Sequence, residues 1–172
     1  PESIPAAVEA MSACGVDYVK AGLNACQVDG RSLTFVRDAR ALSRGLIIVF
    51  KAVLPPRLEG VSALADCGIR GIMLDTSEKF GPVLTALLSL DYLEAFVQEA
   101  KRNQLMSGLA GRLRQDDISQ LAATGADYLG FRSALCRAGE RTSCVDHDYT
   151  LAIRETINQT FEQGLQQANE VA

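Results

Sequence analysis

Short apolar runs recur along the chain, separated by stretches in which apolar residues repeat at helical spacing. The runs are rich in Val, Ile, Leu and small residues, and several of them are almost continuously apolar. This is typical of parallel strands that are covered on both faces. The pattern predicts strands at Asp17–Gly22, Leu46–Val53, Gly71–Asp75, Met106–Ala110 and Asp127–Arg132.

The stretches between these runs predict helices. The clearest is Asp91–Asn103, whose apolar residues form one stripe and whose N-cap is expected to be Asp91. Further helices are expected at Ile4–Cys14, Leu58–Cys67, Asp116–Ala123 and about His147–Asn169. Gly15, Gly68 and Gly125 follow three of these helices, at the place where a left-handed residue ends a helix.

Strands that alternate with helices predict an α/β fold with a parallel sheet. No linker or low-complexity tract divides the sequence, so residues 1–172 are expected to form a single domain. The number of strands alone favours an open, doubly wound sheet. A (β/α)8 barrel needs eight strands and about 250 residues.

Composition narrows the classes of function. The chain has 172 residues, a net charge of −4 and a pI near 5.0, which argues against nucleic acid or an anionic membrane as partner. Its apolar runs are too short to cross a bilayer. Five scattered cysteines without a C-x-x-C pair predict reduced thiols in a cytoplasmic protein, and a single histidine argues against a metal site.

One phrase occurs three times in altered form, over Cys14–Leu23, Cys67–Thr76 and Thr124–Ser133. Each copy reads as a helix end, a glycine, a buried strand and a polar residue where the strand ends. The polar residues are Lys20, Asp75 and Arg132. A base, an acid and an anion binder at equivalent places in a repeated unit predict a catalytic rim.

Lys20 is expected at the end of the first strand, on the same face as Tyr18. Removing a lysine amine from water favours its neutral form, which can act as a base or form a Schiff base. The alternative is a lysine whose apolar stem packs at the strand end while its amine stays in solvent. The local sequence leaves both interpretations open.

Asp75 ends the third strand and shares a face with Met73, and Lys79 follows four residues later. This spacing allows an ion pair that orients the Lys79 amine over a site. The alternative is an aspartate that starts a turn and a solvated loop lysine, and the local sequence favours that alternative.

The segment from Gly108 to Arg114 leaves the fourth strand and enters a helix start. Small residues before a helix N-terminus offer free backbone N–H groups to a phosphate. Arg132, at the next strand end, adds a forked anion binder. The two neighbouring strand ends therefore predict an anion site that includes Gly111 and Arg132. No catalytic or binding role is assigned to Lys51 or His147.

Four segments carry a resemblance to a known family: DYVKAGL (Asp17–Leu23), MLDTSEK (Met73–Lys79), GLAGRLRQDDI (Gly108–Ile118) and DYLGFRSALCRAGERT (Asp127–Thr142). Together, in this order, they resemble the (5-formylfuran-3-yl)methyl phosphate synthases, also called 4-(hydroxymethyl)-2-furancarboxaldehyde-phosphate synthases. The resemblance covers the chain up to about Asp146.

The resemblance implies a (β/α)8 TIM barrel, of which this chain would hold about the last five βα units. It also implies a carbon–oxygen lyase that condenses two molecules of glyceraldehyde 3-phosphate into a furan aldehyde phosphate for methanofuran biosynthesis. The expected partner is a small phosphorylated substrate, and no cofactor or metal is expected. Open sheet edges would pair with one another, so a homo-oligomer is expected.

The resemblance also assigns roles to individual residues. Lys20 matches a strand lysine that accepts a proton, and Asp75 and Lys79 match an acid and a second lysine. The substrate phosphate is expected near Gly111, Arg132 and Ser133.

The sequence departs from the family pattern in several places. Arg112 stands where relatives have a small polar residue, and Ser133 stands where they have glycine. The Schiff-base lysine of the family lies in an Asp-x-Lys motif on an early strand, which this sequence lacks. About three βα units are therefore expected to precede Pro1.

Two rival interpretations remain at this point. One is another Schiff-base barrel aldolase that acts on a different sugar phosphate. The other is a degenerate half-barrel without catalytic activity that serves as an assembly or binding subunit.

Overall fold

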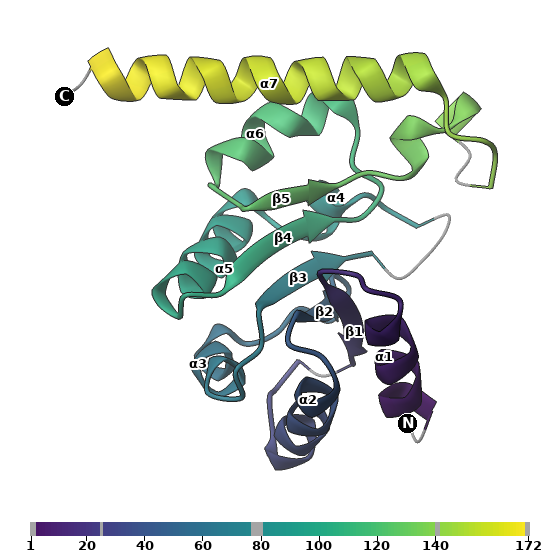
Figure 1. The fold of residues 1–172 in the computed structure, drawn as a ribbon. Helices are drawn as coiled ribbons and strands as arrows, with labels where there is room; N and C mark the ends of the chain where they lie inside the picture. The colour runs from purple at the N-terminus through teal and green to yellow at the C-terminus, as the bar shows by residue number, and fades with distance from the viewer. Residues whose placement is uncertain (1–2, 25, 77–80, 140–141, 171–172) are drawn as a thin grey trace.

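A parallel five-stranded sheet forms the centre of the molecule (Figure 1). The computed structural model describes residues 3–24, 26–76, 81–139 and 142–170. The strands lie side by side in chain order: β1 (Val19–Leu23), β2 (Leu46–Lys51), β3 (Gly71–Asp75), β4 (Met106–Ala110) and β5 (Tyr128–Gly130). All five predicted strands are present, and β3 and β4 have the predicted bounds.

Helices precede, connect and follow the strands. They are α1 (Ser3–Ala13), α2 (Gly30–Leu42), α3 (Val61–Ala65), α4 (Leu84–Leu87), α5 (Leu90–Arg102), α6 (Ile118–Ala123) and α7 (His147–Glu170). Short 3-10 turns are η1 (Leu58–Gly60), η2 (Gln115–Asp117), η3 (Ser133–Leu135) and η4 (Arg137–Gly139). The sequence pattern did not predict α2, because its buried face combines Ser32 with Val36 and Ala39 and so lacks a strong apolar stripe.

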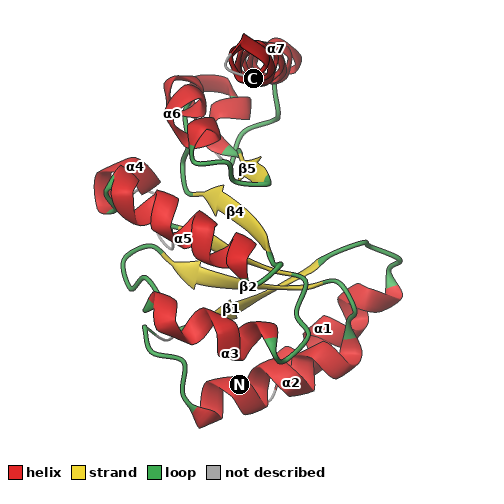
Figure 2. Cartoon of the chain, turned by 90° about the vertical axis from the view of Figure 1, so that its left-hand side faces the viewer, coloured by secondary structure: helices red, strands yellow, loops and turns green. Residues whose placement is uncertain are grey.

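One face of the sheet carries the main core. Alternate strand residues such as Ala21, Ile48 and Leu74 are buried there against side chains of the helices, including Val36 and Phe96. Figure 2 shows α2, α3 and α5 on the same side of the sheet. The opposite face, here called the inner face, carries Lys20 and a small apolar cluster of Ile47, Met73, Ala110, Val49 and Tyr128.

The strand order decides between the two sheet architectures raised by the sequence. A doubly wound sheet reverses its strand order at a switch point and carries helices on both faces. The five strands here follow one another without reversal. The preference for a doubly wound sheet, which rested on strand number alone, is therefore wrong.

The glycines of the repeated phrase end their helices as predicted. Gly15, Gly68 and Gly125 have φ values of +74°, +75° and +75°. In each case a left-handed residue stops the helix and turns the chain into the next strand. The repeated phrase is thus a repeated helix-to-strand connection.

Ser89, not Asp91, caps α5. The Ser89 hydroxyl accepts a hydrogen bond from the Tyr92 N–H at 3.3 Å, and Asp91 lies in the first turn. Ser89 and Asp91 both belong to residue types that favour the N-cap position. The helix starts directly after Ser89, so the prediction of Asp91 as N-cap is wrong.

Replacing Ser89 with alanine is expected to lower the free energy of unfolding by about 1 kcal/mol, because the capped N–H loses its partner. Urea unfolding followed by circular dichroism measures the change. The Asp91→Asn control keeps the cap and should cost less than half as much. A larger loss in Asp91→Asn than in Ser89→Ala would contradict this assignment.

Along the part of the chain that the structure describes, no helix has both the length and the apolar content needed to cross a membrane.

Candidate active site

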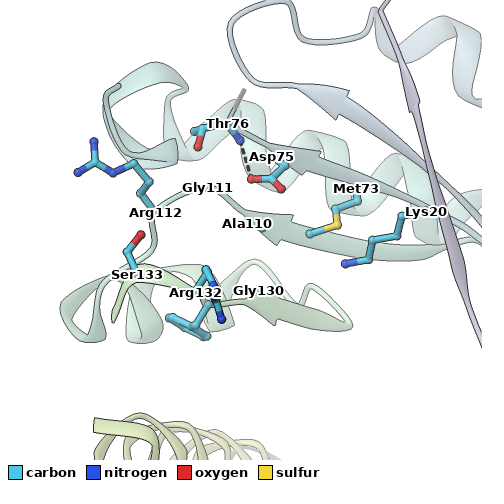
Figure 3. A pocket seen from close by; sticks show the side chains of 11 residues that line it. Lys20, Met73, Asp75, Thr76, Ala110, Gly111, Arg112, Gly130, Arg132 and Ser133 are labelled. Atoms are coloured by element: carbon cyan, nitrogen blue, oxygen red, sulfur yellow. Dashed lines mark hydrogen bonds between the residues drawn. The ribbon is translucent and has the colours of Figure 1, made fainter. Parts of the chain in front are cut away.

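A cavity of about 360 Å³ opens beside the carboxyl ends of β3, β4 and β5 (Figure 3). Its lining consists of Lys20, Met73, Asp75, Thr76, Ala110, Gly111, Arg112, Gly130, Phe131, Arg132 and Ser133. Five residues that the sequence singled out therefore meet in one cavity: Lys20, Asp75, Gly111, Arg132 and Ser133. The sixth, Lys79, lies outside the described residues.

Lys20 reaches the cavity from within the sheet. It is the second residue of β1 and pairs in register with Ile47, so the expectation that it ends its strand is wrong. The strand runs on to Leu23 because its ladder with β2 continues as far as Phe50. The Lys20 side chain extends along the inner face, where its Nζ lies 5.3 Å from the centroid of the Tyr128 ring.

Asp75 stands where the sequence places it, as the last residue of β3. Its Oδ1 accepts a hydrogen bond from the Thr76 N–H at 2.7 Å. Met73, two residues earlier, also lines the cavity, which confirms that the two side chains share a face. The half-buried carboxylate is the acidic group among the residues that line the cavity.

Gly111 lets the end of β4 pass close to the end of β3. Its φ is +123°, and a Cβ atom at this position would lie 2.5 Å from Thr76 Cγ2 and 2.9 Å from Thr76 N. Any larger residue would have to push the two loops apart, and the cavity lies between them. The glycine is therefore required by backbone conformation and by close approach.

The helix start after this loop does not face the cavity, contrary to the prediction of free N–H groups there. The Arg114 N–H donates to Asp117 Oδ2 at 2.8 Å, so the Asp117 side chain occupies the N–H group at the start of η2. Among the described residues, none from 113 to 118 lines the cavity. Within this loop, Gly111 and Arg112 line the cavity and could offer backbone contacts to an anion.

Arg112 is a cavity residue that sequence reasoning did not assign. Its backbone is left-handed, with φ +54°, and its guanidinium donates to the carbonyl of Gly81. The only signal in the sequence was its departure from the small polar residue of the family pattern.

The charges around the cavity favour an anion. Among the described residues that line the cavity, the Lys20 amine and the guanidinium groups of Arg112 and Arg132 outnumber the Asp75 carboxylate. Lys20 lies at one end of the cavity, and Arg112 and Ser133 lie at the other (Figure 3). A ligand with a phosphate at one end and a reactive carbon at the other would match this separation.

Metal ligands do not gather in the described part of the chain, where no group of three or more His, Cys, Asp or Glu side chains could hold an ion. His147, in the first turn of α7 as predicted, is exposed and lies outside the cavity.

Comparison with known families agrees with the resemblance seen in the sequence. The family model described as 4-HFC-P synthase matches residues 1–154. The chain belongs to the 4-HFC-P synthase family. The match leaves out most of α7, which is consistent with the weak family signal of that helix.

Relatives of the same family resemble most of the chain. A Methylorubrum extorquens protein, provisionally named (5-formylfuran-3-yl)methyl phosphate synthase, is 40% identical over 144 residues, which are 83% of this chain and 59% of the relative. The (5-formylfuran-3-yl)methyl phosphate synthase of Methanopyrus kandleri is 31% identical over 154 residues, which are 82% of this chain and 64% of the relative. The chain thus spans about three fifths of the length of these 4-HFC-P synthase relatives.

Solved structures show the same kind of fold at low sequence identity. Thiamine phosphate pyrophosphorylase from Pyrococcus furiosus matches with a TM-score of 0.59 and 18% identity, over 89% of this chain and 65% of that one. A structure titled native KDPGal matches with a TM-score of 0.52 and 17% identity, over 90% of this chain and 66% of that one. Both neighbours are TIM-barrel-like.

Proposed function

We propose that the chain carries part of the active site of a lyase that condenses two molecules of glyceraldehyde 3-phosphate into (5-formylfuran-3-yl)methyl phosphate, for methanofuran biosynthesis. The observation that supports this most is the single cavity in which a lysine amine, a carboxylate and an anion-binding end come together. Condensing two phosphorylated aldehydes needs proton transfer at carbon and a firm hold on phosphate, and both kinds of group are present.

We further propose that residues 1–172 form one domain that corresponds to the last five βα units of a (β/α)8 barrel. The strands follow one another in chain order, as they do in a barrel. The cavity lies at the carboxyl ends of β3, β4 and β5, the edge at which barrel enzymes carry their active sites. The coverage of about three fifths of the relatives fits this assignment.

In the proposed reaction, Lys20 takes a proton from the carbon that becomes the nucleophile and later returns protons as water leaves. Asp75 holds the amine of Lys79, which assists the departure of phosphate and the closure of the ring. The family resemblance places the Schiff-base lysine in an Asp-x-Lys motif that this sequence lacks. That covalent step is therefore assigned to the full-length family enzyme and not to these residues.

The anion-binding end of the cavity would hold the substrate phosphate. Arg132 offers a fork of N–H donors that matches two phosphate oxygens, and the Ser133 hydroxyl adds a third donor. Gly111 allows the two loops at this end to approach each other, because a side chain there would overlap Thr76. Holding the phosphate fixes the distance between the reacting carbon and Lys20.

The proposal predicts formation of a furan aldehyde, which is a new aromatic chromophore. The full-length protein, which in this proposal supplies the Schiff-base lysine, is incubated with glyceraldehyde 3-phosphate, and near-ultraviolet absorbance and released phosphate are followed together. Both signals should rise with the same time course, and glycerol 3-phosphate, which lacks the aldehyde, should give neither. Cleavage or formation of a different sugar phosphate without the chromophore would favour the rival aldolase. No reaction with any of these substrates would favour a subunit without catalytic activity.

A further inference from the structure

Lys20 and Tyr128 come from the two edge strands of the sheet and meet above its inner face. Three strands separate β1 from β5 in the order of the sheet. The sheet nevertheless places Lys20 Nζ 5.3 Å from the centroid of the Tyr128 ring. A cation within about 6 Å of a ring centroid is attracted by the negative face of the ring. The contact thus joins opposite edges of the sheet through a side chain of the cavity.

The position of the Tyr128 ring is fixed from below by Gly108. A Cβ atom at Gly108 would lie 2.2 Å from Tyr128 Cζ and 2.5 Å from its hydroxyl oxygen. The ring therefore rests directly on the backbone of β4. It also packs against the inner-face cluster of Ile47, Met73 and Ala110.

The hydroxyl group of Tyr128 gives no reason, within the described structure, for a tyrosine at this position. The oxygen is buried, and among the described residues it has no hydrogen-bond partner. Burial, with a smaller contribution from Asp127, raises the pKa of Tyr128 to about 12. The side chain is consequently a neutral phenol near pH 7, and its contact with Lys20 runs through the ring face and not through a phenolate charge.

We infer that Tyr128 is a positioning residue whose ring face holds the Lys20 ammonium beside the cavity. The inference rests on the proposed function of Lys20. When Lys20 has taken a proton from the substrate, the ring stabilises the cation where it formed, and the proton can be returned to the same ligand. Without the ring, the flexible lysine side chain would sample other positions along the exposed inner face.

The first test measures the placement of Lys20 without any turnover. The chain has four lysines, so the ε-methylene resonances of isotope-labelled lysine can be assigned with Lys20→Met. The Lys20 resonance should be shifted upfield by the ring current of Tyr128. Tyr128→Phe should keep this shift. Tyr128→Leu should lose it, and so should Gly108→Ala, which displaces the ring while both partners remain.

The second test asks whether the charge distribution of the ring matters for turnover. Residue 128 is replaced with phenylalanine and then with phenylalanines carrying one, two and three ring fluorines, which weaken the negative face at nearly constant shape. The kcat should fall stepwise, by about three- to tenfold over the series, while KM stays within about twofold. A ring that only fills space would give the same kcat throughout.

The two tests separate this inference from the proposed function. A lost upfield shift in Tyr128→Leu and Gly108→Ala supports the positioning role even if the wild-type protein forms no furan product, an outcome that overturns the proposed function alone. An unshifted Lys20 resonance in the wild-type protein overturns the positioning role. So does a kcat that does not depend on fluorination in an active enzyme.

Discussion

Replacing Lys20 with methionine in the full-length enzyme is expected to lower the turnover of glyceraldehyde 3-phosphate by about 10²- to 10⁴-fold, the usual contribution of a positioned proton-transfer group. Methionine keeps most of the apolar stem of lysine and removes the amine. The methionine side chain still covers the half-buried Tyr128 ring and the apolar cluster beneath it, so the fold should remain intact. The loss should therefore appear in kcat, with KM changed much less.

The matched control is Lys101→Met. Lys101 is exposed in the last turn of α5 and lies outside the cavity lining. Steady-state assays of both variants, with urea unfolding to compare their stabilities, separate chemistry from folding. Turnover of Lys20→Met within about threefold of the wild-type protein would show that Lys20 has no part in proton transfer.

The core strands were the most predictable part of the fold. The bounds of β3 and β4 agree with the sequence, and both strands are buried and paired on two sides. The edge strand β5 is shorter than predicted. Within the described residues it pairs with β4 alone, over Tyr128–Gly130, and Arg132 lies beyond the ladder.

The position of Lys20 shows what the repeated phrase could and could not reveal. Asp75 and Arg132 each follow the cap glycine of their copy by seven residues, whereas Lys20 follows Gly15 by five. The shorter spacing is the signal that Lys20 lies deeper in the sheet, and it was available from the sequence. The contact between Lys20 and Tyr128 was not, because it depends on how far five strands curve toward each other.

The loop after β4 was predictable only in part. Its glycine was correctly placed at the cavity, but the helix N-terminus behind it is turned away, because the Asp117 side chain accepts the Arg114 N–H. Local sequence shows that a capping residue is present but not toward which side the capped turn faces. The same limit applies to Arg112, whose left-handed backbone brings it to the cavity lining.

Replacing Arg132 with methionine is expected to raise the KM for glyceraldehyde 3-phosphate by about 10- to 100-fold, because hydrogen bonds to a charged phosphate each contribute about 1.5–3 kcal/mol. The kcat should fall less, since the substitution leaves Lys20 in place. Competition by inorganic phosphate should weaken in parallel, because the ion uses the same fork of donors. Arg154→Met, on the exposed side of α7, is the matched control and should leave both constants unchanged.

Arg112→Met decides between the two guanidinium groups of the cavity. If KM rises in Arg112→Met and not in Arg132→Met, the phosphate is held by the residue that departs from the family pattern, and the assignment of Arg132 fails.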